Sequence, residues 1–143
     1  MTIVLDASVT LTWLLKDAAN KDHDYSFGVL ATQRTGKSRC IVPVTWALEV
    51  ANVVARSEAK ELITEAQSGA FLELLQALNI EVDGASVAQA LTGTLQLARR
   101  FRLSSYDASY LELALRLRLP IATLDSELLK AAQKCGVRRA EPR

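Results

Sequence analysis

At 143 residues, half of them hydrophobic and just under a quarter charged, the chain has the size and composition of one globular domain with a real core. A net charge of +1 excludes a strong overall attraction to nucleic acid, so a polyanion would have to bind at local patches. The chain begins on a strand-like run without a leader pattern, and it contains no segment apolar enough to span a bilayer. We therefore expect a cytoplasmic protein with no membrane partner. In such a reducing compartment we expect Cys40 and Cys135 to be buried thiols.

The first half of the chain predicts an alternation of short strands and helices. Apolar runs of three or four residues are typical of strands that are buried on both faces of a parallel sheet. Apolar residues three to four positions apart indicate helices. In chain order we expect a strand at 2–5, a helix at 8–16, a polar loop at 17–24, a helix through Val29 and Leu30 that ends before Gly36, and a strand at 40–42.

The second half continues this alternation, and no linker rich in proline, glycine or serine divides the chain. The sequence therefore predicts the α/β class, as one domain of residues 1–143 with a small, mainly parallel sheet. In chain order we expect helices at 45–56 and 61–78, a strand at 79–82, a helix from Gly84 to about 102, a helix from Ser104 or Ser105 to about 119, a strand at 121–124, a helix at 127–134 and a final edge strand from Val137.

Two aspartates come at the ends of predicted strands. Asp6 directly follows the first strand, and Asp125 follows the strand at 121–124. Ligands gather beyond the carboxyl ends of parallel strands, so the two side chains could lie on one rim. Each could instead cap the helix that follows it, and the sequence leaves both interpretations open.

Two further acids lie on the apolar stripes of predicted helices. Glu49 falls between Trp46 and Val50, and Asp107 shares a helix face with Leu111. Glu49 would be exposed if its helix buried a different face, and Asp107 could merely stabilise the helix dipole. Inward orientation of both is the stronger interpretation.

Together the four acids indicate a cation site. Neighbouring carboxylates raise one another's pKa values unless a cation neutralises them. Oxygen ligands favour Mg²⁺ or Mn²⁺, whereas zinc prefers histidine and cysteine, and the single histidine, His23, lies in a polar stretch without the spacing of a zinc site. The chain has neither a glycine-rich phosphate loop nor a Gly-x-Ser-x-Gly elbow. The residues alone therefore indicate metal-dependent phosphoryl or phosphodiester chemistry.

Six short segments, in a fixed order along nearly the whole chain, carry a family resemblance. They are Val4-Leu5-Asp6-Ala7-Ser8, Pro43 through Asn52, Leu103 through Leu111, Ala122-Thr123-Leu124-Asp125, Ala131-Ala132 and Gly136-Val137. Each segment is weakly specific by itself, but the ordered set resembles the PIN-domain nucleases, and especially the VapC-type ribonuclease toxins of prokaryotic toxin–antitoxin pairs.

The resemblance implies a PIN-like three-layer α/β/α fold and an endoribonuclease that hydrolyses RNA through metal-activated water. Its cofactor would be Mg²⁺, with Mn²⁺ as a substitute. Asp6 and Asp107 match the most direct metal ligands, and the other two acids complete the site directly or through water. Ser8 and Thr123 match hydroxyl positions that orient carboxylates or bound water. The residues that match the catalytic and metal-binding set are Asp6, Glu49, Asp107 and Asp125.

The resemblance also implies an RNA substrate, a cognate antitoxin protein and a homodimer. Phe71, Leu75 and Leu78 could belong to such an interface or simply to the core. Three basic groups could hold RNA phosphates or be solvated surface. These groups are Arg99, Arg100 and Arg102; Lys37 and Arg39; and Arg138, Arg139 and Arg143.

Two other functions remain as alternatives to a nuclease. One is a catalytically weak PIN-like module that binds RNA or regulates another protein. The other is a phosphoryl-transfer domain in which Asp6 accepts the phosphate. The run Asp6-Ala7-Ser8 lacks the second aspartate that haloacid-dehalogenase-like phosphatases carry two residues on, which counts against this last alternative.

Overall fold

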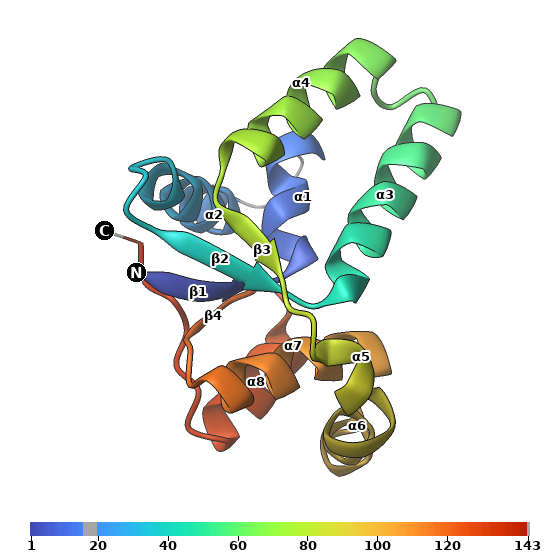
Figure 1. Ribbon diagram of the computed structural model, residues 1–143. Helices are drawn as coiled ribbons and strands as arrows, with labels where there is room; N and C mark the ends of the chain where they lie inside the picture. The colour runs from blue at the N-terminus through green and yellow to red at the C-terminus, as the bar shows by residue number, and fades with distance from the viewer. Residues whose placement is uncertain (16–19, 143) are drawn as a thin grey trace.

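A parallel sheet forms the middle layer of the computed structural model, which describes residues 1–15 and 20–142 (Figure 1). Its strand pairs are all parallel, with Thr2 opposite Arg39 and Val4 opposite Ile121. Across the sheet, the strands are β3 (Ile80–Val82), β2 (Arg39–Val42), β1 (Thr2–Leu5) and β4 (Ile121–Ala122).

Helices cover both faces of this sheet. They are α1 (Ala7–Leu15), α2 (Asn20–Gln33), α3 (Val44–Ala59), α4 (Glu65–Ala77), α5 (Ser86–Gln89), the π-helical turn η1 (Ala90–Thr94), α6 (Leu95–Phe101), α7 (Ser105–Leu117) and α8 (Ser126–Lys134). In Figure 1, α1 to α4 lie above the sheet, and α5 to α8 lie below it. The predicted α/β class and its three-layer α/β/α arrangement are confirmed.

The core forms where β1 meets α7. Ile3 and Leu5 of β1 and Leu111 of α7 have no exposed surface. Full burial of one such side chain stabilises the fold by about 1.5–3 kcal/mol. The sequence left open whether three apolar residues belong to an interface or to the core. All three have exposed fractions below a tenth and belong to the hydrophobic core, so core packing explains their burial: Phe71, Leu75 and Leu78.

The prediction of a loop at 17–24 is wrong for residues 20–24, which are helical. Residues 17–19 lie outside the described part of the chain. Asp22 lies in the first turn of α2, where a negative charge is favourable. His23 stacks on Phe27, one turn further on, with 4.3 Å between the ring centroids. The polar composition of this segment therefore predicted a loop, although Asp22 and the His23–Phe27 ring pair stabilise a helix there.

The boundary between α3 and α4 lies later than predicted. The helix from Val44 continues to Ala59, and a turn with Glu61 at φ 58° separates it from α4. Thr64 then starts α4 with a capping box, because its side chain accepts from the Gln67 backbone and Gln67 accepts from the Thr64 backbone. The pair Thr64-x-x-Gln67 was the readable signal for this start.

The single helix predicted up to residue 102 is divided by the π-turn η1. Gly93 lies in this turn, and a Cβ there would stand 3.3 Å from Gln89 Oε1 and 3.5 Å from Glu112 Cγ of α7. The contact with Glu112 would be an ordinary van der Waals contact, whereas the Gln89 side chain would have to shift by a few tenths of an ångström. The chain ends α6 at Arg102, which adopts the left-handed conformation.

The fourth strand is shorter than predicted, because its last two predicted residues leave the sheet. β4 stops at Ala122, and the next residues bond to side chains near the end of β1. The final edge strand predicted from Val137 is reduced to an isolated parallel bridge between Ile121 and Arg139.

Cys40 is buried and Cys135 is half-buried, and both are free thiols. Within residues 1–15 and 20–142, none of the helices combines the length and the hydrophobicity needed to cross a membrane.

An ion-pair cluster fixes α7 to the segment that follows β3. Arg116 donates to Asp83 Oδ2 at 2.6 Å and to Glu112 Oε1 at 2.7 Å. The Glu112 side chain is only 7% exposed, so it needs this partner. A buried carboxylate that loses its cation costs far more than an exposed pair contributes.

We expect Arg116→Ala to lower the free energy of unfolding by about 3 kcal/mol, because it leaves Glu112 unpaired. Arg39→Ala is the matched control, since Arg39 pairs with Glu81 at 3.2 Å but both side chains are about half exposed. It should change the stability by less than about 1 kcal/mol. Urea denaturation measures both, and equal effects would contradict this account of Glu112.

Candidate functional site

Asp6 lies directly after β1, at the carboxyl edge of the sheet, and is 4% exposed. Its Oδ2 accepts hydrogen bonds from Ser8 Oγ at 2.6 Å and from Thr123 Oγ1 at 2.7 Å. Burial raises the pKa of this carboxyl above its ordinary value, and the two hydroxyl donors oppose the rise. Because both hydroxyls converge on Oδ2, the other oxygen receives neither.

Ser8 and Thr123 also hold the segment after β4. Ser8 Oγ accepts from the backbone N–H of Leu124, and Thr123 Oγ1 accepts from that of Asp125, both at 3.0 Å. The two hydroxyls therefore fix the Asp6 carboxylate and the Asp125 backbone in one network. The orienting role at the site that the resemblance implies for them stays a prediction.

Asp125 caps α8, as one of its two predicted roles requires. Its Oδ1 accepts from the backbone N–H of Leu128 at 2.9 Å. Its charge also contributes to raising the pKa values of Asp6 and Asp107. The two predicted roles of Asp125 are therefore compatible. Its carboxylate caps α8, and the charge of the same carboxylate acts on Asp6 and Asp107.

Glu49 lies in the second turn of α3 and is half-buried, on the flank of the stripe that buries Trp46 and Val50. Tyr110 donates its hydroxyl to Glu49 Oε1 at 3.1 Å. Burial and the repulsion of Asp6 raise the pKa of Glu49 to about 7, and Asp107 adds to this repulsion. Glu49 is thus aimed toward the other acids and not toward solvent alone.

Asp107 lies in the first turn of α7 and is also half-buried. Ser104 caps this helix, as predicted, by accepting from the Asp107 backbone N–H at 3.1 Å. Burial, then repulsion by Asp125 and by Asp6, raise the pKa of Asp107 to about 6. A position near a helix start would by itself lower the pKa, so burial and, after it, the neighbouring acids outweigh the helix dipole here.

The structure therefore brings the four predicted acids into one electrostatically coupled group. Across the ranges that the structure describes, no three acidic, histidine or cysteine side chains stand close enough to enclose a metal ion as they are placed. The donor set nevertheless fits a hard divalent cation, because it is made of oxygen atoms and its negative charges add to the effect of burial in raising the pKa values of Glu49 and Asp107. The metal role of the four acids stays a prediction.

Tyr110 is the residue at this site that the sequence reasoning missed. It lies one turn after Asp107 on α7, and the core encloses it completely. Its position three residues after Asp107, on the same helix face, was the available signal. Nothing in the sequence indicated that it would meet Glu49 of α3.

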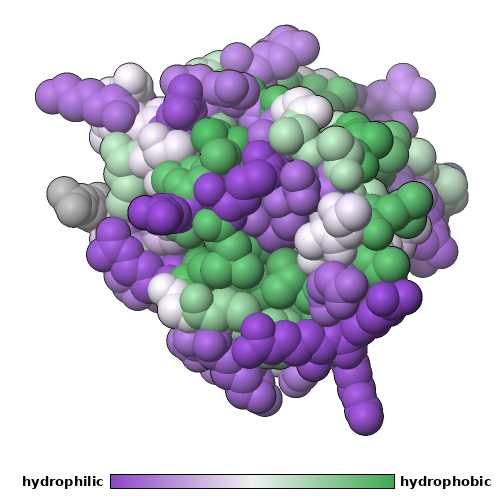
Figure 2. Space-filling view, turned by 60° about the horizontal axis from the view of Figure 1, so that its bottom comes forward, coloured by the Kyte–Doolittle hydropathy of each residue, from purple (hydrophilic) through white to green (hydrophobic). Residues whose placement is uncertain are grey.

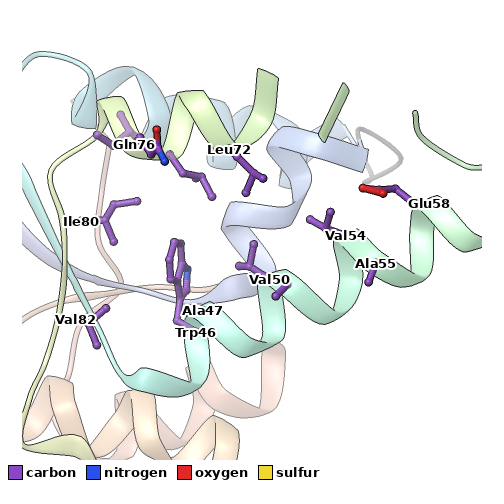
Figure 3. A pocket seen from close by; sticks show the side chains of 13 residues that line it. Trp46, Ala47, Val50, Val54, Ala55, Glu58, Leu72, Gln76, Ile80 and Val82 are labelled. Atoms are coloured by element: carbon purple, nitrogen blue, oxygen red, sulfur yellow. The ribbon is translucent and has the colours of Figure 1, made fainter. Parts of the chain in front are cut away.

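A separate apolar groove lies between α3 and α4 (Figure 3). It has a volume of about 620 Å³, and none of the four acids lines it. Figure 3 shows Trp46 and Val50 of α3 and Leu72 of α4 around the same space. Its lining is mainly apolar, with Glu58 and Gln76 as polar members.

The lower side of the molecule is a mosaic of apolar and hydrophilic areas (Figure 2). Exposed apolar side chains on α5 and η1 include Val87, at 67%, and Leu91, at 83%. These residues lie outside the core, on the same side of the sheet as α7.

A family model described as the PIN domain matches residues 3–134. The chain belongs to the PIN domain family. The PIN domain is a ribonuclease-type fold, and PIN domains are in general nucleases that use divalent metal ions. The family resemblance inferred from the ordered segments is thereby confirmed, while the VapC-type assignment within it stays a prediction.

The PIN fold is also found in a solved structure similar to this chain. The crystal structure of PAE2754 from Pyrobaculum aerophilum has a TM-score of 0.62 and 20% sequence identity, covering 92% of this chain and 87% of that one. At this identity the similarity shows a shared fold. The comparison with curated proteins finds no significant match.

We expect Glu49→Gln to stabilise the metal-free protein at alkaline pH. The folded state raises the pKa of Glu49 from 4.5 to about 7, so the stability of the wild type is fully present below about pH 4.5 and declines as the pH rises through 7. Glutamine does not ionise, so the variant should equal the wild type at pH 4.5 and exceed it at pH 8 by on the order of 1 kcal/mol, after allowance for solvent screening.

Denaturant unfolding in the presence of a chelator, at both pH values, measures this difference. Glu73→Gln, on the exposed face of α4, is the control and should follow the wild type at both pH values. A wild type as stable as Glu49→Gln at pH 8 would contradict the raised pKa of Glu49 that burial and repulsion produce.

Proposed function

We propose that this protein is a Mg²⁺-dependent endoribonuclease of the VapC toxin type, in which Mn²⁺ can replace Mg²⁺. The observation that carries the proposal is the electrostatic coupling of Asp6, Glu49, Asp107 and Asp125 within a PIN domain. The proposed reaction is hydrolysis of an RNA phosphodiester bond.

In this proposal Asp6 and Asp107 hold the divalent ion directly, and Glu49 and Asp125 complete the site directly or through water. When bound, such an ion stabilises the charge that develops on a phosphodiester and lowers the pKa of water so that it can act as the nucleophile. Ser8 and Thr123 fix the Asp6 carboxylate through Oδ2, and we assign its second oxygen to the ion.

The basic group before α7 is better placed to hold RNA than the group of Lys37 and Arg39. Arg99, Arg100 and Arg102 are exposed where α6 ends, close in the chain to the Asp107 turn. Arg39 instead pairs with Glu81 at the amino end of β2, away from the carboxyl edge that carries Asp6. We therefore assign phosphate contacts to the α6 group.

We also propose that an antitoxin and a second copy of the chain bind this protein, and the groove between α3 and α4 supports an apolar protein contact. Its lining is almost entirely apolar, and Leu72 and Val82 on its border are about half exposed. An apolar segment of a partner would remove this surface from water.

The alternative function is a catalytically weak PIN-like module that binds RNA or regulates another protein. A weak module and an active nuclease make opposite predictions for the same substitutions.

We expect Asp6→Asn and Asp107→Asn each to reduce RNA cleavage by on the order of 100-fold or more, because each removes a proposed ligand charge. Mapping of RNA ends after induction, and cleavage of RNA by the purified protein with Mg²⁺, Mn²⁺ or a chelator, measure the effect. Glu73→Gln is the control for expression and should cleave as the wild type does.

Circular dichroism establishes that the two asparagine variants keep the fold. RNA-end maps that are identical for the wild type and the folded Asp6→Asn protein would overturn the nuclease assignment. They would leave the weak RNA-binding module as the better function.

A further inference from the structure

Tyr110 is a completely buried side chain with a polar hydroxyl group. It has no exposed surface, and its neighbours on α7, Leu111 and Leu113, are also completely buried. A buried phenol needs a partner for its hydroxyl, and Glu49 Oε1, at 3.1 Å, supplies it. The contact joins α7 to α3, two helices that lie on opposite faces of the sheet (Figure 1).

Glu49 has a reason to turn away from the other acids. Asp6 and Asp107 repel its charge, and its half-exposed position gives its flexible side chain access to water. Asp6 is held by two hydroxyls and Asp125 by its helix cap, but Glu49 is held by the hydroxyl of Tyr110. This hydroxyl is thus the group that opposes the repulsion.

The phenol suits this task because it stays protonated. Burial, together with the negative charges of Asp6 and Glu49, raises the pKa of Tyr110 far above its ordinary value. Tyr110 therefore acts as a hydrogen-bond donor. The link between Thr45 Oγ1 and Ser109 Oγ, 3.0 Å apart, holds the same two helices together beside it.

We propose that Tyr110 is a positioning residue, which holds Glu49 Oε1 and thereby keeps the second carboxylate oxygen, Oε2, available to a divalent cation. This inference rests on the proposed function, since it assigns Glu49 to the cation site. Tyr110 itself touches neither the cation nor the RNA. It acts through Glu49.

The test measures Mn²⁺ binding by the full chain, by calorimetry and by the electron paramagnetic resonance of free Mn²⁺. We expect Tyr110→Phe, which removes only the hydroxyl, to weaken Mn²⁺ binding about 10-fold. In a Glu49→Gln background the same change should have no further effect, because the group that Tyr110 positions is no longer charged. Tyr25→Phe is the matched control, since Tyr25 donates to Ala140 O at 2.7 Å, and it should bind Mn²⁺ as the wild type does.

A second variant keeps the inference testable if Tyr110→Phe does not fold. Glu49→Asp retains the charge but withdraws the carboxylate from the phenol by one methylene group, and it should lose affinity to a similar extent. Unchanged Mn²⁺ affinity in either variant, or additive losses in the double variant Tyr110→Phe/Glu49→Gln, would overturn the positioning role. If the wild type bound Mn²⁺ normally, the proposed cation site would survive that result, whereas a wild type that bound no Mn²⁺ would overturn both.

Discussion

Four carboxylates from separate parts of the chain lie close enough for their negative charges to repel one another, and the surrounding structure holds them against this repulsion. Each is held differently: Asp6 by two hydroxyls, Asp125 by the start of α8, Asp107 by a capped helix and Glu49 by a buried phenol. The layers of the fold supply these supports, since β1 and α7 meet in the most deeply buried part of the molecule. The stability of the core thus offsets the repulsion within the acidic group.

Sequence reasoning reached the acids because their positions relative to apolar patterns are local properties. Asp6 follows an apolar run, and Asp107 shares a face with residues that the structure buries. The contact between Tyr110 and Glu49 was beyond such reasoning, because it depends on how α7 and α3 are placed about the sheet. Asp125 shows a different limit of sequence reasoning. The sequence suggested helix capping and a place among the acids as alternatives, but the one side chain does both.

The errors in the fold have equally specific causes. Polar residues 20–24 concealed the start of α2, because helix-end charges and a ring pair stabilise it without an apolar stripe. The π-turn at Ala90–Thr94 has no marker in the sequence apart from Gly93, where a Cβ would crowd only the Gln89 side chain. By contrast, the start of α4 could have been predicted from Thr64 and Gln67, whose side chains and backbones satisfy one another.

The hydroxyl network at Asp6 also limits how the loops of this protein can vary. Leu124 and Asp125 both give their backbone N–H groups to it, so the three residues between β4 and α8 have a fixed length and path. The turn at Gly36, with φ at 77° and no atom near its absent Cβ, is open to solvent on that side. Divergent relatives that keep the acidic group should therefore gain and lose residues near Gly36, while the spacing from Thr123 to Asp125 stays constant.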